Sequence, residues 1–377
     1  MSAPFWSVAV FGRNEAPTLG SCLAALAAAG RGINLEVAVM LNGCTDDSTL
    51  VARRAMERLG LHGLVCSIPF ADKSNAINAW LHDLAPAADT YVCVDAYAMV
   101  APDALQQLGA ALAAAPTALA AAAMPSTGRS AQHLRQTMRQ YSGLHGSLFA
   151  LRGGFVARLR AAGLRLPVGL YRGDGLLGAI VLHDLDAVGT ARNDERIALV
   201  PKATWATPRL RPWRPADLVR YLRRQVRQAR GRLESAAIRE VIYRAGFAGL
   251  PADANRMIAE WAAADPRSRA PRFWRDPLGW LALRQARHAT PPDPRSLVPE
   301  ILARFPAAAP ATRIAQAGLH KTGRWRSSDI RHEPEIHISG MGLCLMPRRR
   351  RRPPRTRRAK RPASEGKPRL DTSGQMV

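Results

Sequence analysis

Several polar side chains follow short apolar runs, at places where α/β proteins commonly gather ligand-binding groups. Each lies just after a predicted strand or at a predicted helix start. The set consists of Arg13, Asn14, Glu15, Asn42, Thr45, Asp46, Lys73 and Asp95. Helix N-termini offer free N–H groups and partial positive charge to phosphate oxygens, and Lys73 can pair with a diphosphate as a point charge. These residue types predict a ligand that carries phosphate.

A sheet must position these residues, because short apolar runs alternate with helical patterns over residues 6–124. The predicted strands are 6–11, 35–41, 64–68 and 90–95, with 119–124 as a fifth. The predicted helices are 17–29, 46–60, 73–84 and 102–115. Strand–helix–strand alternation with short links indicates parallel strands joined by right-handed crossovers, and strands that are apolar on both faces need helices on both sides. We therefore predict an α/β fold with a parallel or mixed sheet flanked by helices.

The pattern becomes more helical in the second half of the chain. Residues 129–144 and 173–183 are predicted helices, and 145–151 and 196–200 are extended. The longest helical pattern, 215–248, is amphipathic, with an apolar arc and a cationic arc on opposite sides. The cationic arc holds Arg220, Arg223, Arg224, Arg227 and Arg230. Weaker, Pro-broken helices follow to about residue 288.

The net charge of +25 over 377 residues is unevenly distributed. Residues 1–208 hold 17 basic and 15 acidic side chains, or +2, whereas 209–232 hold nine and one, or +8. The tail 348–377 holds twelve and two, or +10. A nucleic acid or an anionic membrane is therefore a partner only for one helix and the tail. The tail has few apolar residues to bury and is predicted to be disordered. Its Arg- and Pro-rich composition is also what translation of GC-rich DNA in a shifted reading frame would give.

Four segments in this order resemble the family-two glycosyltransferases, which have the GT-A fold. The segments are VAVFGRNE at 8–15, LNGCTDDS at 41–48, DKSNAIN at 72–78 and YVCVDAYAMV at 91–100. They are similar to the family's R-N-E-like turn, its turn after the second strand, its G-K-x-x-A-x-N helix start and its D-x-D strand end. The resemblance covers residues 6–232 and implies a nucleotide-binding sheet that leads into an acceptor half. The nucleotide end of the donor would then be held by Asn14, Glu15, Asn42, Lys73 and Asp95.

Asp95 stands where the family's D-x-D motif begins. In the family this carboxylate contacts the ribose or the metal, and the second Asp holds Mn²⁺ or Mg²⁺. Here Tyr97 takes the place of that second Asp. Hard divalent cations prefer carboxylate oxygens, so the resemblance implies Asp95 as a metal ligand while Tyr97 leaves dependence on a divalent cation open. Asp95 as a cap of the following turn is the structural alternative.

Two polar residues after the second predicted strand have a structural alternative. Asp46 in T-D-D-S suits a helix cap or first-turn acid, and capping is the interpretation we favour for it. Asn42 occupies the place where the family often has a base-contacting Asp. Asn42 can still hydrogen-bond a base edge, but a preference for uracil does not carry over.

Asp174, in the sequence RGDG, aligns with the second acid of the family's E-D pair, and Gly173 stands at the first. The resemblance implies that Asp174 is the general base. An inverting transfer needs such a carboxylate to take the proton of the acceptor hydroxyl as that oxygen attacks the sugar carbon. The structural alternative is an N-cap for a helix over 175–182.

The arginines of the amphipathic helix resemble the family's Q-x-x-R-W region. Arg224 stands at the Gln position and Gln228 at the Trp position, and the missing Trp argues against a polymer synthase. Guanidinium groups suit a diphosphate leaving group, so Arg227 and Arg230 are candidate contacts. A solvated cationic face and peripheral docking on anionic lipid are the two other interpretations.

The His, Glu and Cys residues of the chain give no strong indication of a metal site or a disulfide. The run HEPEIH at 332–337 is interrupted by Pro334 and fits no zinc spacing, so it is interpreted as a solvated loop. Five cysteines without a C-x-x-C pair predict neither a disulfide framework nor a zinc site, and suit the cytosol. No signal peptide or membrane span is predicted, which leaves a cytoplasmic protein that is soluble or peripheral at the inner face of the membrane.

Together the residues and the resemblance predict a bacterial-type inverting glycosyltransferase that uses a nucleotide-sugar donor and a lipid-linked or saccharide acceptor. The predicted organisation is a GT-A-like domain at 1–208 (nucleotide-sugar half 1–124, acceptor half 125–208), a helical region at 209–290, an irregular segment at 291–347 and the tail at 348–377. A non-catalytic sugar-nucleotide-binding relative is the first alternative. The second, ranked last, is a nucleic-acid-binding protein acting through its basic tail.

Overall fold

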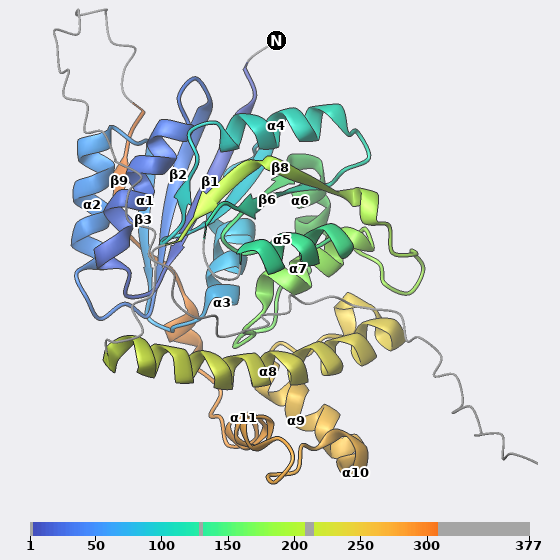
Figure 1. Ribbon diagram of the computed structural model, residues 1–377. Coiled ribbons are helices and arrows are strands. Elements are labelled where there is room, and N and C mark those ends of the chain that lie inside the picture. The colour runs from blue at the N-terminus through green and yellow to red at the C-terminus, as the bar shows by residue number, and fades with distance from the viewer. Residues whose placement is uncertain (1–2, 128–130, 208–214, 308–377) are drawn as a thin grey trace, which may run out of the picture. The chain divides into compact units, whose positions relative to one another are not determined.

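The strands of the described chain form one mixed sheet of nine (Figure 1). This computed structural model describes residues 3–127, 131–207 and 215–307, with side chains in the first helix after the gap described from Gln225 onward. The HEPEIH run at 332–337, Cys344 and the tail 348–377 lie outside the described residues. The strands are β1 (Phe5–Gly12), β2 (Asn34–Asn42), β3 (Gly63–Ile68), β4 (Thr90–Asp95), β5 (Met99–Val100), β6 (Ala120–Pro125), β7 (Leu148–Arg152), β8 (Ile197–Ala206) and β9 (Glu300–Phe305).

The order across the sheet is β5-β8-β6-β7-β4-β1-β2-β3-β9. Strands β4, β1, β2 and β3 are parallel neighbours, and β7 and β9 run antiparallel at either side of them. From β1 the chain first moves to β2 and β3, and then returns to place β4 on the other side of β1. The β1–β4 junction is therefore the switch point of the sheet, where open α/β sheets bind ligands. The carboxyl ends are level there, because Phe11 of β1 pairs with Asp95 of β4.

Helices cover both faces of the sheet, as the doubly apolar strands require. The helices are α1 (Ala16–Ala29), α2 (Ser48–Leu59), α3 (Lys73–Asn78) with a π-helical continuation (Ala79–Leu84), α4 (Ala104–Ala114), α5 (Ala131–Gln140), α6 (Gly153–Ala161), α7 (Gly173–Leu182), α8 (Pro215–Ala245), α9 (Ala254–Ala264), α10 (Pro266–Arg269) and α11 (Pro277–Arg287). Helices α1, α2 and α4 pack on one face, around Leu23, Met56 and Leu105. Helices α3, α6 and α7 pack on the other, around Trp80 and Phe155.

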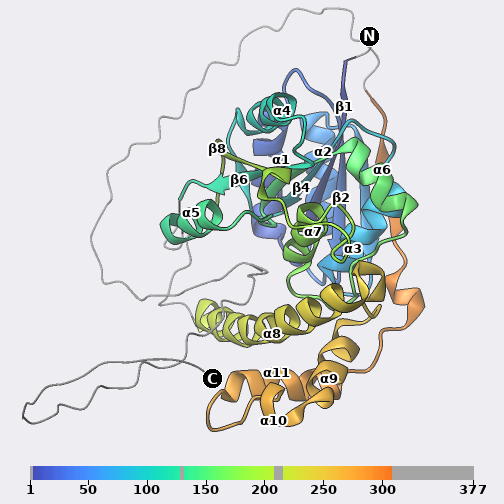
Figure 2. The ribbon, with the colours of Figure 1, turned by 90° about the vertical axis from the view of Figure 1, so that its right-hand side faces the viewer.

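Helix α8 lies below the sheet in both views, and α9, α10 and α11 lie on its far side (Figures 1 and 2). Its C-terminal part joins the core of the α3, α6 and α7 face through Ile238 and Ile242. A separate small core, which includes Leu233, Ile258 and Leu283, joins α8 to α9 and α11. Because α8 contacts the segment just before α7, the helical region is in a position to support residues at the carboxyl edge of the sheet.

The predicted fold class is confirmed: a mixed α/β sheet carries helices on both faces and a helical region follows it. Several details differ from the prediction, among them the start of β7 and the unpredicted β5 and α6. The segment 291–347, expected to be irregular, contains β9, which pairs antiparallel with β3. The helix expected at 73–84 divides into α3 and a π-helical turn. Asp174 lies inside the first turn of α7, whose N-cap is Arg172, so the capping alternative for Asp174 is wrong.

Among the residues that the structure describes, no helix is long and apolar enough to cross a bilayer. Cys22, Cys44, Cys66 and Cys93 are free. Three of these thiols are buried, and burial raises the pKa of Cys22 to about 12 and that of Cys66 to about 11. They are therefore neutral core groups at ordinary pH, as expected from their apolar context.

Candidate active site

The turns after β1 and β2 hold several of the residues expected to bind the nucleotide. Asn14 has a left-handed backbone (φ 54°), and its Oδ1 accepts a hydrogen bond of 2.7 Å from the N–H of Thr45. The buried Asn42 donates from Nδ2 to the carbonyl of Gly12 at 3.2 Å. Glu15 donates from its N–H to Ser48 Oγ at 2.9 Å. These contacts fasten one turn to the other and fix the loop backbone at the edge of the sheet.

Asp46 links the starts of two helices. Its Oδ2 accepts from the N–H of Ala16 in α1 at 3.1 Å, and its Oδ1 accepts from the N–H (3.1 Å) and Oγ (2.6 Å) of Ser48 in α2. Burial opposes ionisation, but the hydrogen bonds from Ser48 and Ala16 outweigh it and lower the pKa of Asp46. The N-cap of α2 is Asp47 rather than Asp46, so the predicted position of the cap is wrong by one residue. The Asp46 carboxylate nevertheless accepts from the first N–H of both helices, and the bond to α1 is one that the sequence did not predict.

Lys73 and Asp95 form an ion pair at the switch point of the sheet. The two atoms Lys73 Nζ and Asp95 Oδ1 are 2.5 Å apart, and the amine also donates to the carbonyl of Gly146 at 3.4 Å. The Lys73 side chain is 35% exposed and that of Asp95 only 8%. The other carboxylate oxygen, Oδ2, accepts from the Tyr97 hydroxyl at 2.6 Å and from Ser147 Oγ at 3.3 Å. Asp95 thus fixes the amine of a side chain that is itself partly exposed.

Gly146 brings the third charged group, Asp174, to the same place. Its N–H donates to Asp174 Oδ2 at 2.7 Å. A Cβ built on Gly146 would lie 2.6 Å from Lys73 Nζ and 3.1 Å from Asp174 Oδ2. The absent side chain is therefore what lets the amine and the second carboxylate approach the same backbone segment. The structure thus brings together Lys73, Asp95 and Asp174, which lie 101 residues apart at the extremes of the set.

The electrostatics of this cluster favour a permanent positive charge on the lysine. Burial disfavours the charged amine, but the Asp95 and Asp174 carboxylates outweigh it and raise the Lys73 pKa above its usual value. Burial, together with the charge and hydrogen bond of Asp95, raises the pKa of Tyr97 well above its usual value. Lys73 is therefore an ammonium and Tyr97 a neutral hydroxyl donor at physiological pH.

These residues do not fit the divalent cation that the resemblance implies. Both oxygens of Asp95 already accept hydrogen bonds, and Tyr97, at the position of the second Asp, is a donor to Asp95. An ion beside Asp95 would also meet the Lys73 ammonium. Among the described residues, no three His, Cys, Asp or Glu side chains gather into a set that could hold a metal ion. Hard cations need several oxygen ligands, so no step is assigned to a metal here.

Gly173 allows the helices α3 and α7 to begin side by side. A Cβ at this residue would lie 2.4 Å from Ser74 Oγ, which donates to the carbonyl of Leu170 at 3.0 Å. A Glu, the family's residue here, would collide with α3. The departure from the E-D pair therefore has a steric reason, and it leaves Asp174 as the acid at this helix start.

Arg230 faces protein groups with all its donor nitrogens. Nε lies 2.9 Å from Glu234 Oε1, Nη1 donates to Asn255 Oδ1 at 2.7 Å, and Nη2 donates to the carbonyl of Gly169 at 2.8 Å. Glu234 is fully buried and also accepts from the N–H of Tyr171 at 3.0 Å. Burial raises the pKa of Glu234, while Arg230 and that N–H oppose the rise. Arg230 thus braces residues 169–171, just before α7.

Arg227, the other residue of this helix that was expected to contact the diphosphate, differs from Arg230. Arg227 is exposed, and its guanidinium lies 5.7 Å from the centre of the Tyr171 ring. The side chain of Arg224 is outside the described part of the chain. Arg172, which sequence reasoning quoted only as part of RGDG, donates to Gln228 Oε1 at 2.8 Å and so ties the N-cap of α7 to α8.

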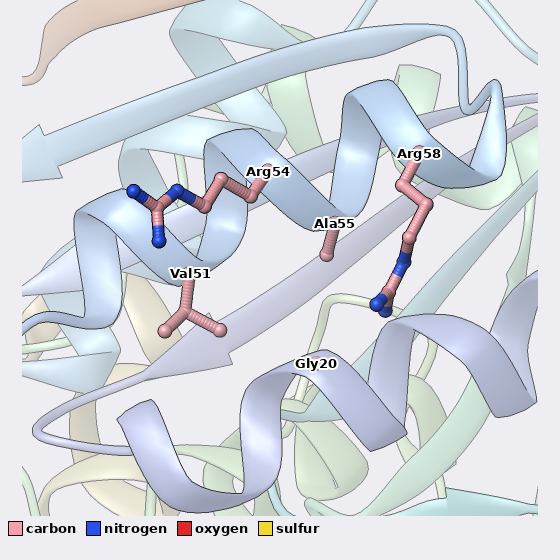
Figure 3. Close-up of a pocket in the computed structure, with 5 residues that line it drawn as sticks. All are labelled: Gly20, Val51, Arg54, Ala55 and Arg58. Atoms are coloured by element: carbon pink, nitrogen blue, oxygen red, sulfur yellow. The ribbon is translucent and has the colours of Figure 1, made fainter.

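One hollow of the structure lies away from the charged cluster. A shallow pocket of about 310 Å³ lies between α1 and α2, and Arg54 and Arg58 flank it (Figure 3). Its lining shares no residue with the Lys73, Asp95 and Asp174 cluster. The only charged groups in its lining are the two guanidinium groups, and the lining contains no carboxylate, imidazole, hydroxyl or thiol. We therefore do not assign a catalytic role to this pocket.

Comparisons with known proteins give likeness in structure alone. The chain matches no protein-family model and no curated protein in sequence. It is similar to the mannosyltransferase PcManGT from Pyrobaculum calidifontis in complex with GDP-Man and Mn²⁺, with 19% identity over 76% of this chain and 81% of that one, at a TM-score of 0.47. It is also similar to glucosyl-3-phosphoglycerate synthase from Mycobacterium tuberculosis in complex with Mn²⁺, UDP-glucose and phosphoglyceric acid, with 20% identity over 60% and 78% of the chains, at a TM-score of 0.42.

These glycosyltransferases have the kind of fold that the sequence resemblance implied. At such identities and TM-scores the activity of this chain must be inferred from its own residues. Sequence reasoning found Lys73, Asp95 and Asp174, but it missed Ser147, Gly146 and Glu234. Gly146 and Ser147 directly precede β7, and the antiparallel pairing of β7 with β4 brings them to the carboxyl end of β4. Finding them from the sequence would have required both the start and the direction of β7.

Proposed function

We propose that the chain is an inverting glycosyltransferase, which moves a sugar from a nucleotide-sugar donor to an acceptor hydroxyl. The observation that supports this proposal most strongly is the Lys73 ammonium held between Asp95 and Asp174 at the switch point of the sheet. A cation for a diphosphate and a carboxylate for proton transfer are the two groups that the reaction requires.

In the proposed reaction the donor lies along the carboxyl ends of β1, β2 and β4. Asn14, Glu15 and Asn42 form the loop wall at its nucleotide end. Asp174 takes the proton of the acceptor hydroxyl while that oxygen bonds to the anomeric carbon of the sugar. The bond from this carbon to the diphosphate oxygen breaks, and its electron pair leaves with the nucleoside diphosphate. Lys73 stabilises the charge that develops on the leaving group.

The helix α8 takes part by two different routes in this proposal. Arg230 acts as a positioning residue, since its three nitrogens hold Glu234, Asn255 and Gly169. Arg227, which is exposed, stays a candidate contact for the diphosphate or for an anionic surface. Of the two diphosphate contacts that the sequence suggested on this helix, Arg227 and Arg230, the proposal keeps only Arg227.

The test is a titration of the full chain with UDP-, GDP- and dTDP-sugars, with and without Mn²⁺, followed by a turnover assay over small saccharide and lipid-linked acceptors. Binding together with transfer, or with slow donor hydrolysis, is the expected result. Binding without any turnover across the acceptors would favour the non-catalytic relative. Salt-steep binding of DNA or RNA without nucleotide-sugar binding would favour the nucleic-acid alternative, whose basic tail lies outside the described residues.

We also propose that the protein is bacterial and cytoplasmic, with peripheral contact to an anionic membrane. The segment 272–275, between α10 and α11, supports the contact. There Trp274 and Phe273 are 76% and 57% exposed, and Arg272 and Arg275, both exposed, flank them. Aromatic rings at the headgroup level with cationic neighbours are typical of interfacial binding. In this proposal the segment 272–275 is a second candidate contact with the membrane, beside the exposed Arg227 of α8.

A further inference from the structure

We propose that the Lys73 ammonium replaces the divalent cation at this site, so that a nucleoside diphosphate binds here without metal. This inference rests on the proposed function, because it concerns the charge that meets the donor diphosphate. It assigns to Lys73 more than a supporting contact: Lys73 would be the cation that Asp95 holds in place, as an acidic residue elsewhere holds Mn²⁺ or Mg²⁺.

The first step of the argument is the set of partners of Asp95. Oδ1 has the Lys73 amine at 2.5 Å, and Oδ2 has the Tyr97 and Ser147 hydroxyls at 2.6 and 3.3 Å. Each donor belongs to the protein, and the carboxylate is 8% exposed. A metal could bind Asp95 only by displacing an ion pair and a short hydrogen bond. No second carboxylate adjoins Asp95 in sequence to compensate that loss, because residue 97 is Tyr.

The second step is the way in which Lys73 is held. It is the first residue of α3, whose N-cap Asp72 is buried and accepts from the N–H of Asn75 at 3.0 Å and from the N–H of Gly169. Arg230 donates to the carbonyl of the same Gly169 at 2.8 Å. The backbone of Lys73 is thus fixed from α8 through Gly169 and Asp72. A cation that is positioned before the ligand arrives needs little reorganisation to act on it.

The third step is the capacity of the amine to reach a ligand. An ammonium has three N–H bonds, and those of Lys73 meet Asp95 Oδ1 and the Gly146 carbonyl. The side chain keeps 35% of its surface exposed. The amine also lies 5.9 Å from the centre of the Phe11 ring. Two protein acceptors for three N–H bonds leave one N–H for a phosphate oxygen, and the partly exposed side chain gives that oxygen a way to approach.

The fourth step is the balance of charge. Lys73 and Arg172 supply two positive charges against the carboxylates of Asp95 and Asp174, and Arg172 attracts Asp174 electrostatically. The cluster is therefore neutral before a diphosphate enters. With the exposed Arg227 at the same loop, the diphosphate meets positive charge without a metal. In this proposal one net positive charge, from Arg227, and the directed N–H bond of Lys73 together take the place of the metal.

The test measures the Kd of UDP and of GDP for the full chain by isothermal titration calorimetry. The titrations are made once in EDTA and once in about 1 mM Mn²⁺. We expect the Kd to change by less than about threefold between the two conditions. Lys73→Met should weaken binding in EDTA by about tenfold or more, as expected for loss of a charge-assisted hydrogen bond. Lys202→Met is the matched control, since Lys202 is exposed on β8, and it should bind like the wild type.

A second arm measures the metal itself by the Mn²⁺ electron paramagnetic resonance signal. The wild type should leave Mn²⁺ free, whereas Tyr97→Asp, which restores the second carboxylate, should bind it. Nucleotide binding by the wild type only in the presence of Mn²⁺ would overturn the inference and leave the proposed function intact. Absence of nucleotide binding under both conditions would overturn the proposed function, and the inference with it. If Tyr97→Asp does not fold, the inference is decided by the wild-type Kd in EDTA and in Mn²⁺ and by the Kd values of Lys73→Met and Lys202→Met.

Discussion

Two ion pairs, one at the site and one beneath it, illustrate how differently the molecule uses charge. Lys73 and Asp95 are 2.5 Å apart, with side chains 35% and 8% exposed, and two protein groups accept from the amine, Asp95 Oδ1 and the Gly146 carbonyl. Arg230 and Glu234 are 2.9 Å apart, with side chains 17% and 0% exposed, and each donor nitrogen of the arginine has a protein partner. The first pair can exchange contacts with a ligand, whereas the second can only hold structure.

The difference shows that a cation near a sheet edge is informative only together with its partners. Sequence position alone assigned both Lys73 and Arg230 to a diphosphate. The structure shows different roles for the two residues, because the protein supplies an acceptor to every nitrogen of Arg230 but not to every N–H of Lys73. The two are also linked: Arg230 contacts Gly169, Gly169 contacts Asp72, and Asp72 is the N-cap that precedes Lys73. One residue is placed to act on a ligand, and the other fixes the segment from which the first acts.

The strongest test of the site side of this comparison is Asp174→Asn. If Asp174 is the base, kcat should fall by a factor of about 10² to 10⁴, because proton transfer by a positioned carboxylate contributes that much. The Kd of the donor should change little, since the amide keeps the shape of the side chain. Asp103→Asn, at an exposed N-cap without a side-chain hydrogen bond, is the control. An unchanged kcat in Asp174→Asn would remove the base from the mechanism.

The supporting side of the comparison is tested by Arg230→Ala. It leaves the buried Glu234 without its charge partner, so the free energy of unfolding should fall by about 3 kcal/mol or more. Urea denaturation measures this loss. Arg232→Ala, two residues further along α8, breaks an exposed pair with Asp276 and should cost less than about 1 kcal/mol. Normal stability of Arg230→Ala with a large loss of nucleotide affinity would instead restore the role that the sequence suggested.

Gly146→Ala tests the spacing between the amine and the base. Its Cβ would lie 2.6 Å from Lys73 Nζ, so the amine or the loop must shift, and kcat/KM should fall by about tenfold. Gly143→Ala is a close control three residues earlier, because no atom lies within 4 Å of its Cβ. Circular dichroism should show the same fold for both variants. Equal activity of the two would mean that Gly146 has no role in assembling the cluster.

The smallest expected effect concerns a region far from both pairs. Trp274→Ser should leave turnover of a water-soluble acceptor unchanged, since Trp274 is 76% exposed beyond α8. It should reduce binding to vesicles that contain phosphatidylglycerol by severalfold, because a Trp ring contributes at the headgroup level. Vesicle co-sedimentation measures the effect, with phosphatidylcholine vesicles as the uncharged reference. Equal binding of wild type and variant would place any membrane contact on another surface.

Much of the fold followed from local patterns. Alternating strands and helices over 6–124 specified a sheet, and the strand-end rule then brought Asn42, Lys73 and Asp95 to one edge. Asp95 could be assigned because β4 is short, apolar and ends at that residue. These inferences needed only periodicity, which reports the burial of each segment.

What could not be predicted depends on contacts between segments distant in the chain. Nothing in the sequence near Gly173 shows that Ser74 lies 2.4 Å from its missing Cβ. The role of Arg230 depends on Gly169 and Asn255, which come from other elements. Strand β9 has little to mark it locally, since its side chains are half-buried or exposed, and it forms because the edge of β3 is available for pairing.

The most direct measurement is a crystal structure of the protein with a nucleoside diphosphate, grown in EDTA. The account predicts the diphosphate at the carboxyl ends of β1 and β4, with Lys73 Nζ within hydrogen-bond distance of a phosphate oxygen and Asp174 on the side where an acceptor would enter. A nucleotide bound elsewhere, such as between α1 and α2, with Lys73 still turned only to Asp95 and Gly146, would contradict it.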